Sequence, residues 1–155
     1  MVTALISLRG LHILRAVTIR AARGDITRFT TPRPLMSVHG RVPSERASGS
    51  KRRTGGITKT GNGPVRRIRV EAAWNYCVPA RKTRHLQAKA AAAPDRVPAI
   101  AWHAQKRLCA RTSRLSAVRK HHGKVTTAVA RERVGFIGAI VCEVNARPHA
   151  SRALT

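Results

Sequence analysis

Acidic residues are the scarcest component of this sequence. Its 155 residues contain 6 Asp and Glu against 31 Lys and Arg, which gives a formal net charge of +25. A charge of this size repels itself in a compact chain and favours a polyanionic partner, of which nucleic acid is the commonest. The acids are also scattered singly, so the sequence predicts no cluster of carboxylates that would hold metal ions.

Cysteines and long apolar runs are scarce as well. The three cysteines are widely separated and odd in number, which excludes a disulfide framework or a zinc ribbon and favours a reducing cytosol. The longest apolar run, residues 134–144, contains glycines and Glu143 and is far shorter than the roughly 20 residues of a membrane-spanning helix. No basic segment precedes the apolar N-terminus, so we do not expect a secretory signal.

Apolar residues recur at helical spacing over most of the chain, and no segment alternates with a period of two. We therefore expect an all-α fold. The spacing and the flanking prolines and glycines predict two short helices around Gly10 within 5–22, then helices over 31–38, 64–78, part of 80–96, 97–118 and 125–144.

Two of these helices have a well-defined predicted face. On the helix that begins at Pro64, the expected buried face is Val65, Ile68, Ala72 and Tyr76, and the basic residues that project from its first half are Arg66, Arg67 and Arg69. On the helix over 97–118, only Arg111 interrupts the inner apolar stripe.

The expected domain is small and helical, with a helix-hairpin-helix-like N-terminus, although an ordinary helical hairpin fits the same residues. We divide the chain into a helical hairpin (1–23), a helical domain (24–145) and a disordered tail (146–155). Residues 43–63 contain five glycines and many basic residues, and we expect a long, irregular, basic loop there.

The most cationic stretch runs from Arg46 to Arg69, where eight basic residues occur without an acid. Ser48 lies inside it. A serine hydroxyl attacks a phosphodiester when cations or a metal stabilise the developing charge, but such a stretch is also typical of a basic linker. The nearby Gly56–Gly61 segment does not fit a nucleotide-binding phosphate loop, because Thr58 stands where that motif needs glycine.

Several segments of the chain recur in a fixed order and spacing in one known family. They are 24–29 (GDITRF), 31–36 (TPRPLM), 42–45 (VPSE) followed by the Ser-Gly at 48–49, 55–63 (GGITKTGNG), 70–74 (VEAAW), 100–108 (IAWHAQKRL) and 129–132 (VARE). Together they make the chain resemble, over about residues 8–145, the C-terminal domain of transposases of the insertion-sequence 110/116/902 family.

The resemblance implies a DNA recombinase. Relatives pair this helical domain with an N-terminal RuvC-like domain that bears a carboxylate metal site, and at least some are guided by an RNA encoded in the element. The resemblance places the family's serine at Ser48, which would then be the nucleophile that joins DNA covalently. From charge and position we assign nucleic-acid binding to Lys51, Arg52, Arg53, Lys59, Arg66 and Arg67.

The same resemblance sets the expected cofactors and partners. No metal ligand is expected in this chain, because Mg²⁺ would belong to the RuvC-like domain, which the sequence lacks. DNA, a guide RNA and full-length transposase copies are the expected partners, in the cytoplasm and nucleoid of a bacterium. The chain would then be inactive alone.

Some positions depart from the family pattern. Basic residues replace apolar or acidic ones at Arg20, Arg23, His39 and Arg41, and two of these, Arg23 and Arg41, would occupy faces that the helix pattern buries. We therefore interpret the chain as a truncated and decaying transposase copy. The alternatives are a non-catalytic basic protein that coats nucleic acid, and a remnant without function.

Overall fold

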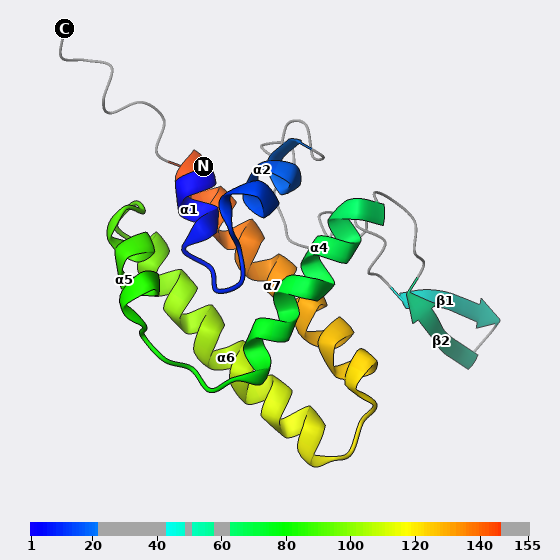
Figure 1. Ribbon diagram of the computed structural model, residues 1–155. Coiled ribbons are helices and arrows are strands. Elements are labelled where there is room, and N and C mark those ends of the chain that lie inside the picture. The colour runs from blue at the N-terminus through cyan, green and yellow to red at the C-terminus, as the bar shows by residue number, and fades with distance from the viewer. Residues whose placement is uncertain (22–42, 49–50, 58–62, 147–155) are drawn as a thin grey trace, which may run out of the picture.

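The fold is built mainly of helices (Figure 1). The computed structural model describes residues 1–21, 43–48, 51–57 and 63–146. Within these ranges lie α1 (Val2–Ile6), α2 (Ile13–Ala21), β1 (Pro43–Ser48), β2 (Lys51–Ile57), α4 (Gly63–Ala73), the 3-10 helix η2 (Trp74–Cys77), α5 (Arg84–Ala91), α6 (Val97–Ala117) and α7 (His122–Asn145). The expected helical fold class is confirmed.

Helices α6 and α7 form the centre of the body. A short connection makes them antiparallel neighbours, and α4 packs across α7 (Figure 1). On α6 the residues Val97, Ala101, Ala104 and Leu108 are buried, at the spacing of three and four that puts them on one face. The α7 stripe runs through Val129 and continues to Ile137, Ile140 and Val141.

The N-terminal helices are fastened to the end of α4 by the loop between them. Gly10 has a φ of +79°, and a Cβ there would lie 2.7 Å from the Ala72 carbonyl oxygen, so only glycine fits this approach. The Tyr76 hydroxyl donates a hydrogen bond to the Arg9 carbonyl oxygen at 3.1 Å, and the Arg9 guanidinium donates to the Pro79 carbonyl oxygen at 3.0 Å. A helix lies on each side of Gly10 as predicted, but the first, α1, lies mostly before the predicted range of 5–22. The glycine also sets how closely this loop approaches α4.

Residues 43–57 correct the expectation of an irregular loop. The described residues, 43–48 and 51–57, form two antiparallel strands that we call the hairpin, with β1 paired to β2 from Pro43↔Ile57 to Ser48↔Lys51 and an irregularity between Pro43 and Glu45. This stretch contains mainly glycine, serine and charged residues. It lacks the alternation of apolar and polar residues that predicts a strand. Backbone hydrogen bonds across the pair form the ladder whatever the side chains are.

Some expectations fall outside the described residues. These are the helix over 31–38, the boundary between 23 and 24, the tail beyond 146, and the buried placement of Arg23 and Arg41. Among the residues that the structure does describe, no helix is long and apolar enough to cross a membrane.

Two arginines lie in the core. Arg69 and Arg133 are each 1% exposed, and among the residues that the structure describes none of their guanidinium nitrogens has a hydrogen-bond partner. Arg69 was expected to project from α4, but it falls on the same stripe as Val65 and Ala72, four residues after the first and three before the second. Burial lowers the pKa of the Arg133 guanidinium. A buried charge without a partner costs several kcal/mol, so we expect both residues to destabilise the fold.

We expect Arg69→Met and Arg133→Met each to raise the free energy of unfolding by at least about 1 kcal/mol, because methionine fills a similar volume without a charge to desolvate. Urea unfolding followed by circular dichroism measures the change. Arg67→Met on the exposed face of α4 is the matched control, with an expected change within about 0.5 kcal/mol. A loss of stability in either core variant would show that its guanidinium has an anionic partner in the folded protein.

Candidate functional site

The hairpin carries the residue that the sequence singled out. Ser48 ends β1 and is paired with Lys51, the first residue of β2. Behind them the register pairs Ala47 with Arg52 and Arg46 with Arg53. The ladder therefore places the backbone of Ser48 beside that of Lys51, with Arg52 and Arg53 next along β2. In Figure 1 the hairpin extends away from the helical body, on the side where α4 begins.

Two of the predicted basic residues lie on the first turns of α4. Arg67 is exposed and Arg66 is half-buried, and both line an open hollow of about 1020 Å³ with Ile68, Val70 and Glu71. The helix is fixed at this end by Pro64, whose φ suits the first turn of a helix. Lys59 lies outside the described residues, so the structure does not test its place beside Arg66 and Arg67.

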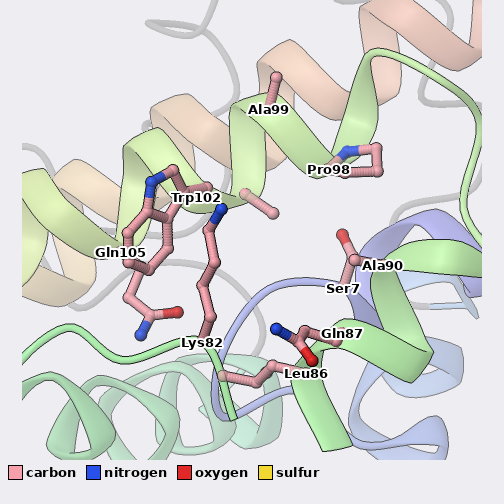
Figure 2. A pocket seen from close by; sticks show the side chains of 10 residues that line it. Ser7, Lys82, Leu86, Gln87, Ala90, Pro98, Ala99, Trp102 and Gln105 are labelled. Carbon is pink, nitrogen blue, oxygen red and sulfur yellow. The ribbon is translucent and has the colours of Figure 1, made fainter. Parts of the chain in front are cut away.

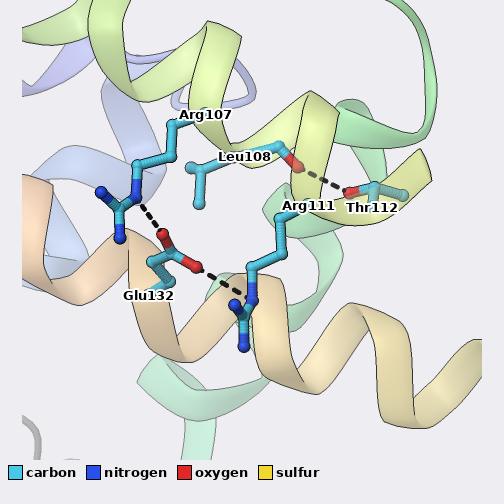
Figure 3. A network of polar contacts seen from close by, with 5 residues as sticks. All are labelled: Arg107, Leu108, Arg111, Thr112 and Glu132. Atoms are coloured by element: carbon cyan, nitrogen blue, oxygen red, sulfur yellow. Dashed lines mark hydrogen bonds and ion pairs between the residues drawn. The ribbon is translucent and has the colours of Figure 1, made fainter. Parts of the chain in front are cut away.

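Ion pairs between helices engage several acids. Glu132 of α7 contacts both Arg107 and Arg111 of α6, the second at 2.9 Å between Nε and Oε2 (Figure 3). Arg111, the one break in the predicted α6 stripe, is thus explained by its partner on α7. Elsewhere Glu71 pairs with Arg15 of α2 at 3.5 Å.

In the part of the chain that the structure describes, the side chains that could bind a metal ion lie apart from one another. Within the described ranges, no group of three or more His, Cys, Asp or Glu residues is placed to hold a metal ion. The donor set there therefore does not fit a magnesium centre, which needs several oxygen ligands at one point. Cys77, Cys109 and Cys142 are free thiols.

Aromatic residues with basic neighbours form a second feature, which the sequence interpretation did not single out. Trp74, 48% exposed, stacks on His122 with 4.6 Å between ring centroids. Trp102 has the ammonium groups of Lys82 and Lys106 at 5.1 and 5.9 Å from its ring centroid. The sequence does show that Lys106 follows Trp102 by four residues on one predicted helix. The contact between Trp102 and Lys82 joins distant segments of the chain, so it could be recognised only from the fold.

Comparison with known proteins identifies the class to which this helical domain and its basic hairpin belong. The model of the family described as "Transposase IS116/IS110/IS902 family" matches residues 2–89. The chain belongs to this family of transposases, and the resemblance seen in its sequence segments is confirmed.

One relative makes the likeness specific. The protein named "Putative transposase y4qE", from Sinorhizobium fredii (strain NBRC 101917 / NGR234), is 45% identical over 142 residues. The aligned part is 92% of this chain and 36% of the relative, so the chain spans about a third of that protein's length. No solved structure matches the chain.

We expect Glu132→Gln to lower the free energy of unfolding by about 1 kcal/mol, because two partly screened ion pairs between α6 and α7 are lost together. The loss should shrink in 1 M salt relative to 0.1 M, since screening weakens the parent's pairs. Denaturant unfolding at both salt concentrations measures it. Glu71→Gln is the comparison, because Glu71 makes a single printed ion pair of 3.5 Å with Arg15 and its side chain is 49% exposed, so a smaller loss is expected. Equal losses in the two variants would contradict a specific role for Glu132.

Proposed function

We propose that this chain is a nucleic-acid-binding portion of a transposase in which Ser48 is the nucleophile. One observation carries the proposal. In a member of a transposase family, Ser48 ends one strand of a hairpin opposite Lys51, within a stretch that contains eight basic residues and no acid. Fixed cations beside a hydroxyl stabilise the negative charge that develops on a phosphodiester under attack.

The reaction proposed is a transesterification. The Ser48 oxygen forms a bond to the phosphorus of a DNA phosphodiester, and the bond from that phosphorus to one sugar oxygen breaks. The released sugar oxygen takes up a proton, and the serine proton passes to a base or to solvent. Because one ester replaces another, the DNA–protein link conserves the bond energy needed for rejoining, and no oxidant or external energy source is required.

The basic residues around Ser48 are proposed to hold the DNA backbone. Three of them, Lys51, Arg52 and Arg53, are the first residues of β2, beside the end of β1. The others are Lys59, which follows later in the chain, and Arg66 and Arg67, which lie near the start of α4. Such contacts are with phosphates, so they position the nucleic acid without reading its sequence. A guide RNA and further copies of a full-length transposase are the additional partners that we propose.

We also propose that the chain does not complete transposition alone. The acids that the structure describes on α4 and in the middle of α7 are engaged by arginines, and the relative extends over far more sequence than this chain. A carboxylate-held Mg²⁺ from another part of a longer transposase would activate the reaction. DNA binding by this chain needs no such metal, because it rests on charge.

The nucleophile is tested by trapping a covalent DNA adduct. We expect this chain to form an SDS-stable link to DNA when it is mixed with Mg²⁺ and a full-length family member whose own serine is replaced by alanine. Ser48→Ala should reduce that adduct by at least about a thousandfold, as loss of a nucleophile does. Ser44→Ala, on the same strand, is the matched control and should leave it unchanged. An undiminished adduct in Ser48→Ala would refute the assignment.

Backbone binding is tested by its salt dependence. For duplex DNA the logarithm of the binding constant should fall linearly with the logarithm of salt concentration, and Arg67→Gln should reduce that slope by about 1. Fluorescence anisotropy of a labelled duplex measures both. Arg131→Gln, exposed on α7, is the comparison and should change the slope little. The same reduction in both variants would argue against a DNA path along the start of α4.

A further inference from the structure

A pocket lies away from the hairpin, between α1, α5 and α6 (Figure 2). Its volume is about 470 Å³, which falls in the range of small-ligand sites. The walls are mostly apolar: Leu86 and Ala90 come from α5, and Pro98 and Ala99 from the first turns of α6. Trp102 provides the one aromatic surface.

Few polar groups line this pocket. Figure 2 shows Lys82 reaching from the segment before α5 to Trp102, and Gln87 lying on the α5 side. Gln105 is held in place because its side-chain amide donates a hydrogen bond to the Arg81 carbonyl oxygen at 2.9 Å. The floor of the pocket is therefore built by packing and fixed hydrogen bonds, while Lys82 and Gln87 at its edge are exposed and free to follow a ligand.

Basic residues outnumber acids in the sequence around the pocket, where Asp95 is the one acid between α5 and α6. Residues 72–94 contain two lysines, two arginines and a histidine and no acid. On α5, Lys89 and His85 help to lower the pKa of His12, with Lys89 the largest cause, so positive charges are concentrated around that helix. An apolar pocket with an aromatic wall and a cationic edge suits a ligand that is flat, apolar on its faces and linked to anions.

We propose that this pocket binds an unpaired base of single-stranded nucleic acid, with the base against Trp102 and the flanking phosphates at Lys82 and Lys106. The inference rests on the proposed nucleic-acid binding and adds a site for single strands to it. Stacking of a base on an aromatic side chain is worth more than an exposed contact between an ammonium group and a ring. Lys82 can therefore leave the indole face for a phosphate when a base arrives.

The base-paired form does not fit the same site. In a duplex the bases are stacked on one another, and only their edges are accessible from the grooves. A single strand can turn one base into a pocket of this size while its backbone stays outside. The pocket should therefore discriminate strand from duplex, which backbone contacts at the hairpin and α4 do not.

The two tryptophans of the chain provide the test. Trp74→Phe leaves Trp102 as the single tryptophan, and Trp102→Phe leaves Trp74. We expect twelve-nucleotide strands of DNA or RNA to quench the emission of Trp102 in the first variant, while a matched duplex and inorganic polyphosphate quench it little. Comparing the quenching by DNA strands with that by RNA strands shows which of the two nucleic acids the pocket prefers.

Two substitutions then separate stacking from charge. Trp102→Leu should weaken strand binding by about 5- to 100-fold and leave polyphosphate binding within about twofold. Trp74→Leu is its matched control and should leave strand binding unchanged. Lys82→Gln, an exposed change that does not threaten folding, should reduce the salt slope for strands by about 0.7.

Three results would overturn the proposal. If strands bind but Trp102 emission stays constant, the base-binding site is elsewhere, although the proposed nucleic-acid function stands. If a poly-glutamate peptide quenches Trp102 more strongly than the strands do, the pocket serves an acidic protein segment. If neither strand nor duplex binds the chain at all, the proposed function fails together with this site.

Discussion

The Arg69 and Arg133 guanidinium groups are buried in the helical body with no anionic partner among the described residues, and we expect this burial to limit the stability of the body. Each arginine lies in the apolar stripe of its helix, so neither can reach water unless α4 or α7 turns its apolar residues outward as well. The described acids that are engaged pair with other arginines between the helices. The excess of positive charge is therefore a property of the interior as well as of the surface. A domain of this size has few kcal/mol to lose.

The functional parts are distributed around that body. Figure 1 shows the hairpin with Ser48 and helix α5 on opposite sides of it, with α4, α6 and α7 between them. A nucleic acid that contacts the hairpin, the start of α4 and the pocket beside α5 would have to pass around the helices. Such a path suits a flexible single strand better than a stiff duplex, whose bending costs free energy over short lengths.

Helix positions were predictable because apolar spacing and proline placement act locally. The helix predicted over 97–118 is observed as α6 at Val97–Ala117, and α7 is likewise close to its expected bounds. The buried faces were harder. In the second turn of α4 both Ile68 and Arg69 satisfy helical spacing, and hydrophobicity alone selects Ile68. In the structure, however, Arg69 is buried more completely than Ile68 where α4 packs against α7.

The hairpin and the pocket between α1, α5 and α6 were not predicted from the sequence, for different reasons. Strand pairing between residues 43 and 57 rests on backbone hydrogen bonds, which leave no trace in a sequence of small and basic residues. The pocket joins Ser7, Lys82 and Trp102, three residues that are distant in the chain. Ser48 was noted for its basic surroundings, but the family resemblance was what favoured it as a candidate nucleophile, because a serine in a basic stretch has no spacing signal of its own.

The close approach of Gly10 to α4 has a consequence for how the molecule opens. The loop at residues 9–11 and the segment from Ala72 to Pro79 touch through backbone atoms and share hydrogen bonds. Neither can separate without exposing the other, so we expect this loop and residues 72–79 to open as one cooperative unit. Amide protons in this loop should then exchange with solvent only as slowly as the end of α4 itself opens.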